Sequence, residues 1–177
     1  MYMCSLERFK IDLKGLTDEV TTLEYDLDNS FFEALDETEV ESGALHVSLS
    51  IRKASGFFEL LFHTVGTIDI TCDRCLDLME QPIETDNHLV VTLGNTSSTD
   101  DDTVTVDEDE GILDTSWFIY EFIALAIPIQ HVHATGKCNP AMTKALEELS
   151  ADRSGDEESS QTIDPRWAKL AELKLES

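Results

Sequence analysis

Basic residues are scarce in this sequence. Its 177 residues include 12 Lys and Arg against 37 Asp and Glu, which gives a formal net charge of -25. Binding to phosphates depends on Lys and Arg that displace counterions, so direct binding to nucleic acid is disfavoured. A basic partner is the natural electrostatic complement of such a chain. The alternative is that the acids only keep the protein in solution, which is the usual role of an exposed acidic run.

A membrane-spanning segment is also lacking. The longest apolar run, from Trp117 to Ile129, is interrupted by Glu121 and is shorter than the roughly 20 residues that cross a bilayer core. At the N-terminus, Glu7 and Arg8 introduce charge before an apolar signal core can form. The sequence therefore predicts a cytoplasmic protein without a membrane contact.

The motifs of common catalytic sites are missing as well. The sequence contains no G-x-S-x-G, no G-x-x-x-x-G-K-[ST], no G-x-G-x-x-G and no H-E-x-x-H. The 8 glycines are too scattered to surround a phosphate. In so acidic a chain, a pair of carboxylates does not by itself indicate acid and base catalysis. We therefore predict no hydrolytic enzyme and no small-molecule substrate.

Alternation of apolar and polar residues predicts strands in the first half. Leu45 to Ile51 alternates with a period of two, and Leu23 to Leu27 and Leu89 to Leu93 repeat the pattern. Phe57 to Cys72 is a longer apolar strand in which Gly66 predicts a bulge or bend. The predicted fold class is α+β, with an antiparallel β-sheet or partial barrel in the first half, packed by a buried helix.

Helix signals follow the strands. Asn29 or Ser30 is expected to cap a short helix, and Asp114 to cap a longer one over Trp117 to Ile127, which is apolar on nearly every side and should be enclosed. Its one charge, Glu121, is expected at a rim or paired with a donor.

The domain prediction has three parts. Residues 1–149 form a single α+β domain with an acidic surface loop at about 94–110 and a last short helix from Pro140 to Leu149. Residues 150–163 have the composition of a flexible acidic linker. Residues 164–177 form an amphipathic C-terminal helix, in which Trp167, Leu170 and Leu173 have helical spacing. This helix is expected to dock either on its own sheet or on another molecule.

Three cysteines and a histidine form the candidate metal site. Cys72 and Cys75 make a C-x-x-C turn at the end of a strand, and His133 and Cys138 follow the apolar helix. Zinc takes about four thiolate or imidazole ligands in a tetrahedron, so these residues predict a zinc ion that joins the two parts of the chain. Two alternatives stay open: a redox pair of Cys72 and Cys75, and plain packing. His131 is the less suitable histidine, and Cys4 is expected to be a bystander.

Three groups of residues follow one another along the chain: Cys72-Asp73-Arg74-Cys75-Leu76; Glu121 through Leu125, Pro128, His133 and Cys138; and Pro165-Arg166-Trp167 with Leu170 and Leu173. In this order they resemble the YceD family of large ribosomal RNA subunit accumulation proteins. The resemblance covers nearly the whole chain. No catalytic role is attached to the matching positions. The acidic loop, the linker and His131 are not part of the shared pattern.

The resemblance implies a non-enzymatic factor that supports accumulation of large-subunit ribosomal RNA and ribosome assembly. Family members are small acidic proteins whose genes commonly lie beside that of a small basic protein of the large subunit. Together with the charge of -25, this predicts binding to a basic large-subunit ribosomal protein, with RNA contacted only indirectly. The alternative is a thiol-disulfide oxidoreductase that uses Cys72 and Cys75.

Overall fold

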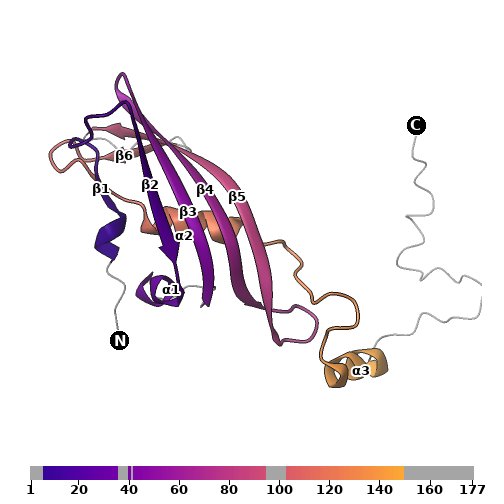
Figure 1. Ribbon diagram of the computed structural model, residues 1–177. Helices are drawn as coiled ribbons and strands as arrows, with labels where there is room; N and C mark the ends of the chain where they lie inside the picture. The colour runs from indigo at the N-terminus through magenta and orange to yellow at the C-terminus, as the bar shows by residue number, and fades with distance from the viewer. Residues whose placement is uncertain (1–5, 36–39, 41, 95–102, 150–177) are drawn as a thin grey trace, which may run out of the picture.

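Long paired strands dominate the molecule (Figure 1). The computed structural model describes residues 6–35, 40, 42–94 and 103–149. Within them a five-stranded sheet has the order β2-β3-β4-β5-β6, and a two-stranded sheet pairs β1 with β7. The fold is therefore α+β, as predicted, and the sheet is not closed into a barrel. In chain order the elements are η1 (Leu6–Phe9), β1 (Lys10–Asp12), β2 (Val20–Leu27), α1 (Asn29–Leu35), β3 (Ser42–Ala54), β4 (Phe57–Thr71), β5 (Leu78–Leu93), β6 (Thr103–Val106), β7 (Ile112–Asp114), α2 (Ser116–Leu125) and α3 (Pro140–Leu149).

The strands predicted from alternation are present. In β3 and β4 every second side chain is buried, because one face of the sheet packs against the core and the other is solvated. β5 begins earlier than the sequence indicated, at Leu78, and pairs with β4 as far as Thr71. Its first half, Leu78 to Thr85, has apolar and polar residues in equal number but not in alternation, so an apolar pattern of period two does not reveal it.

Gly66 does not form the predicted bulge. The pairing of β3 with β4 runs through Leu45 and Gly66 without an extra residue. The glycine is needed for a different reason: a Cβ atom there would collide with the carbonyl oxygen of Ala44 on the neighbouring strand. The position thus marks a close approach of two backbones.

One edge of the sheet differs from the antiparallel prediction. β2, β3, β4 and β5 pair antiparallel, whereas β6 lies parallel to β5, with Val90 opposite Thr103. β6 falls within the predicted acidic loop at 94–110, and Asp107 to Glu110 beyond it are exposed. The described part of this loop is therefore a surface excursion with one short strand.

The core lies between the sheet and α2. Figure 1 shows α2 behind the sheet, while no described helix covers the front face. Ile119, Tyr120 and Ile123 of α2 are buried, and the Phe122 ring lies 5.2 Å from that of Phe62. The prediction that this helix is enclosed on all sides was wrong, because Trp117 and Leu125 are exposed on its outer face. Glu121 is exposed on the same outer face, in line with the rim position expected for it.

An Asp accepts a backbone hydrogen bond at the start of both α1 and α2. Asp28 Oδ1 accepts a hydrogen bond from the Ser30 backbone N–H, so the cap of α1 precedes the predicted Asn29 or Ser30. At α2 the N-cap is Thr115, one residue after the predicted Asp114. Asp114 Oδ1 accepts from the Ser116 N–H at 3.0 Å, and Thr115 donates its hydroxyl to the Phe9 carbonyl oxygen at 2.8 Å. These bonds attach the start of α2 to the N-terminal strand pair.

α3 spans Pro140–Leu149, as the sequence predicted. No helix in the described ranges is both long and apolar enough to cross a membrane. The predicted linker at 150–163, the predicted helix at 164–177 and Cys4 lie outside the described residues.

Candidate metal centre

The C-x-x-C motif forms a tight turn directly after β4. The Cys72 N–H donates to the Asp77 carbonyl oxygen, and the Leu76 N–H donates to the Cys72 carbonyl oxygen, both at 2.9 Å. Leu76 has a φ of 61°, in the left-handed region where a Leu is rare and strained. The turn brings both sulfur atoms to one side, and Cys72 and Cys75 are buried at 0% and 2% exposure.

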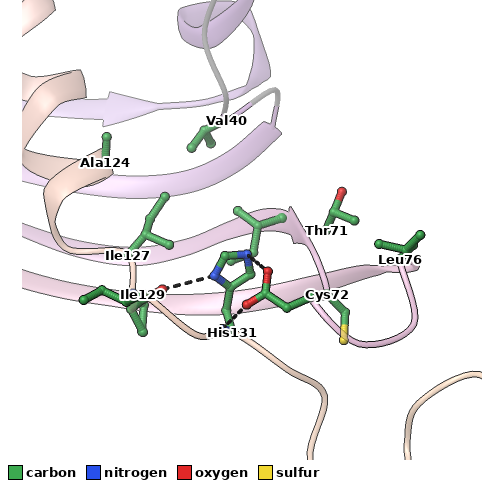
Figure 2. Close-up of a pocket in the computed structure, with 11 residues that line it drawn as sticks. Val40, Thr71, Cys72, Leu76, Ala124, Ile127, Ile129 and His131 are labelled. Carbon is green, nitrogen blue, oxygen red and sulfur yellow. Dashed lines mark hydrogen bonds and ion pairs between the residues drawn. The ribbon is translucent and has the colours of Figure 1, made fainter. Parts of the chain in front are cut away.

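A second segment, after α2, is fixed against this turn by Asp73 and His131. The Asp73 carboxylate accepts the His131 N–H at 2.8 Å and pairs with its Nε2 at 3.3 Å. The Asp73 N–H in turn donates to the His131 carbonyl oxygen at 3.0 Å. The remaining ring nitrogen of His131 lies 3.1 Å from the Pro128 carbonyl oxygen (Figure 2). His131 therefore joins the two segments and does not face the cysteines.

α3 is attached to the same turn through its first residues. The Asn139 side-chain amide donates to Asp77 Oδ2 at 3.1 Å, and Asn139 Oδ1 accepts the Ala141 N–H at 3.0 Å to cap the helix. No residue of α3 is buried. We call residues 72–77 and 128–149 the metal end of the molecule.

The four predicted ligands meet at this end. The ligand atoms of Cys72, Cys75, His133 and Cys138 all lie within 4.8 Å of one another. His133 Nδ1 is 3.3 Å from Cys75 Sγ, and the His133 N–H points to Cys72 Sγ at 3.4 Å. Zinc bonds of ordinary length put tetrahedral ligand atoms about 3.5 to 3.8 Å apart, so the cluster needs only a small contraction around an ion.

The surroundings of the sulfur atoms favour a thiolate at Cys72. Burial raises the pKa of Cys72, but hydrogen bonds from the backbones of Cys75, His133 and Arg74 and from the His133 side chain outweigh it and lower that pKa to about 6. For Cys138, burial and then the neighbouring sulfur atoms of Cys75 and Cys72 raise the pKa. Three sulfur atoms this close carry three negative charges only when a cation neutralises them.

The donor set fits a structural metal ion. Three cysteines and one histidine can fill all four tetrahedral positions, so no open position remains for a catalytic water. The cluster joins residues 58 or more apart in the chain, since Cys75 meets His133. A bound ion would therefore connect the sheet to the segment that leads into α3.

The other histidines lie elsewhere. His46, His63 and His88 are on the uncovered face of the sheet, where they pair with carboxylates such as Asp26 and Asp86. They are therefore surface residues. Sequence reasoning missed Asp73, Asp77 and Asn139, which orient the metal end. Asp73 and Asp77 were missed because acids are too frequent in the chain for single ones to stand out, and Asn139 belongs to no motif.

A comparison with protein families matches most of the chain. Residues 60–174 match the family model described as large ribosomal RNA subunit accumulation protein YceD. The chain belongs to the YceD family. All four candidate ligands lie inside the matched region, whereas β1, β2 and β3 lie before it. No curated protein and no solved structure is significantly similar to the chain.

Proposed function

We propose that this YceD-family chain is a cytoplasmic, non-enzymatic factor that supports accumulation of large-subunit ribosomal RNA by binding a basic ribosomal protein. We further propose that Cys72, Cys75, His133 and Cys138 bind one structural Zn²⁺. The ribosomal role rests on the family match over residues 60–174. The zinc site rests on one observation above all, the convergence of four ligand atoms within 4.8 Å.

Elemental analysis of the purified chain tests the zinc site. We expect about one zinc per chain in the wild type and loss of zinc in Cys138→Ala. The matched control is His63→Ala, which removes an imidazole on the uncovered face of the sheet, away from the cysteines. Zinc that persists in Cys138→Ala, or its absence from freshly reduced wild type, would reject the proposed ligand set.

Charge supports a basic partner. The formal charge is -25, and the uncovered face of the sheet carries acids on adjacent strands, with Asp26 and Asp86 among the most exposed. On the outward face of β2 to β5, Arg52 is the one Lys or Arg, and it is paired with Glu59. Such a face attracts a basic protein and repels RNA phosphates.

Capture of purified large-subunit ribosomal proteins tests this partner. At low salt the chain should retain a basic member, and raised salt should weaken the retention because exposed charges are screened. Neutralising Glu24, Asp26, Glu84 and Asp86 together should weaken capture more than neutralising the four acids at 107–110. A chain that retains no basic ribosomal protein at low salt contradicts the proposed partner.

Depletion of the protein in cells tests the ribosomal role itself. We expect the ratio of large-subunit to small-subunit ribosomal RNA to fall. An unchanged ratio would contradict the proposed role in accumulation of large-subunit ribosomal RNA.

The second candidate is a thiol-disulfide oxidoreductase that uses Cys72 and Cys75. The pKa of Cys72 near 6 favours it, because a thiolate is the attacking species. Access disfavours it, since both sulfur atoms are almost completely buried and exchange requires a disulfide to reach one of them. Catalysis of disulfide reduction by the metal-free, reduced chain, lost in Cys72→Ser, would establish this function in place of the structural ion.

A further inference from the structure

An apolar groove lies beside the metal end. It has a volume of about 470 Å³, and its walls come from the end of β4 with the cysteine turn and from the chain that leaves α2. In Figure 2, Ala124, Ile127 and Ile129 lie on one side of the groove and Thr71, Cys72 and Leu76 on the other, with His131 between them. Cys72 lines the groove, and its sulfur is one of the four candidate ligand atoms. The groove thus shares a wall with the cluster.

The groove exposes large apolar side chains to solvent. Leu76 is 66% exposed and Ile129 is fully exposed, while Ile70 forms part of the buried core. Apolar side chains left exposed around a groove are candidates for contact with another apolar segment. Its shape and chemistry fit the apolar face of a short helix.

Residues 164–174 of the same chain supply such a face. Trp167, Leu170 and Leu173 have the spacing of one side of a helix, after a Pro at a helix start. The segment contains three cations, Arg166, Lys169 and Lys174, and two acids, Asp164 and Glu172. Its small positive balance suits a chain whose net charge is -25.

The intervening chain is long enough for this contact. α3 begins beside the cysteine turn, through Asn139 and Asp77, and its 10 residues extend about 15 Å. The composition of residues 150–163 predicts a flexible linker, and 14 such residues have a mean span of about 20 Å and a maximum of nearly 50 Å. A tether of this length holds its end at an effective concentration on the order of millimolar, so even a weak contact forms.

The family match includes the candidate occupant and all of the groove lining except Val40. It runs from residue 60 to residue 174 and so contains the cysteine turn, the segment after α2 and the C-terminal residues together. β1, β2 and β3, which do not build the groove, precede it.

We propose that the groove is the docking site of this chain's own residues 164–174, with Trp167 and Leu170 packed against Leu76 and Ile129. This contact would cover the apolar wall next to the metal site. The inference does not require the ribosomal partner.

Fluorescence of Trp167 tests the proposal in the full chain. The sequence has 2 tryptophans, so Trp117→Phe leaves Trp167 as the one reporter. We expect a blue-shifted emission and weaker quenching by acrylamide than in a free peptide of residues 160–177. Ile129→Asp, and separately Leu76→Asp, should bring quenching up to the value of the free peptide.

The controls separate docking from folding. Ile129 and Leu76 are exposed, so both variants are expected to fold, and circular dichroism and zinc content check this. Leu61→Asp introduces the same charge on the uncovered face of β4 and should leave Trp167 protected.

Three results would overturn the proposal. One is that acrylamide quenches Trp167 as strongly in the chain with an unmodified groove as in the free peptide, because the segment would then be undocked. Another is protection that persists in Ile129→Asp and Leu76→Asp, which would place Trp167 elsewhere. The third is protection that disappears on dilution together with a dimer in sedimentation, which would make a second copy the occupant.

Discussion

The sheet and the metal end are stabilised in different ways. β2 to β5 are joined by long antiparallel pairings and bury a continuous apolar core that includes Phe62, Leu60 and Ile68. At the metal end, α3 buries none of its residues, and the segment after α2 is attached by polar contacts such as Asp73 with His131. Apolar burial therefore explains the first region but not the second.

This difference gives the candidate ion a specific task. A segment without a core must compensate its ordering entropy by other interactions, and each net hydrogen bond contributes only about 1 kcal/mol. Four metal bonds are far stronger than this. We therefore expect the sheet to fold without metal and the metal end to depend on it.

A substitution in the core between the sheet and α2 should produce the largest loss of stability. Phe62 is 1% exposed and packs on Phe122, so Phe62→Ala should lower the free energy of unfolding by about 3 to 5 kcal/mol through the cavity it leaves. Urea denaturation measures this change. Leu61→Ala, one residue away and 48% exposed, is the matched control and should change it little. Similar effects of both variants would contradict the assigned core.

Asp73→Ala should weaken the metal end without weakening the sheet. The carboxylate accepts one hydrogen bond from His131 and pairs with its ring, and its loss frees the chain that carries His133. We expect zinc affinity to fall by about tenfold or more, as for other residues that orient ligands. Competition with a chelator gives the measurement, and Asp86→Ala on the open face is the control. Unchanged affinity would show that Asp73 does not position the ligands.

Leu76→Gly should have a smaller effect of opposite sign. At a φ of 61° the backbone of Leu76 is strained, which costs about 1 to 2 kcal/mol for an L-residue. Glycine relieves this strain, but its greater conformational entropy in the unfolded chain offsets part of the gain. The net gain of up to about 1 kcal/mol should tighten zinc binding by roughly fivefold. Chelator competition checks this, and weaker binding would show that the Leu side chain contributes more than its strain.

The smallest effect concerns pH at the uncovered face. Hydrogen bonds to Asp26 and then Glu24 raise the pKa of His46 above its ordinary value. His46 therefore contributes its full stabilisation below the pKa it has in the unfolded chain, and this stabilisation is lost as pH rises through its pKa in the folded chain. An NMR titration should show Asp26→Asn lowering the pKa of His46 while the metal end is unchanged. A pKa unaffected by Asp26→Asn would contradict the pairing.

The sequence predicted the parts of the molecule that depend on local pattern. Alternation located β3 and β4, and ligand type and spacing brought out Cys72, Cys75, His133 and Cys138. β1 and β7 were missed because three residues are too few to show a period, and the parallel position of β6 depends on a pairing that no local pattern specifies. α2 was expected to be enclosed because its composition is apolar, whereas exposure of Trp117 depends on what else covers the helix.

Hydrogen exchange with and without a chelator tests the difference between the two regions most directly. We predict that metal removal abolishes amide protection in residues 128–149 and leaves protection in β3 and β4 nearly unchanged. Equal loss of protection in both regions would show that the ion stabilises the whole fold. Unchanged protection at 128–149 would contradict the account, because the metal end would then be stable without metal.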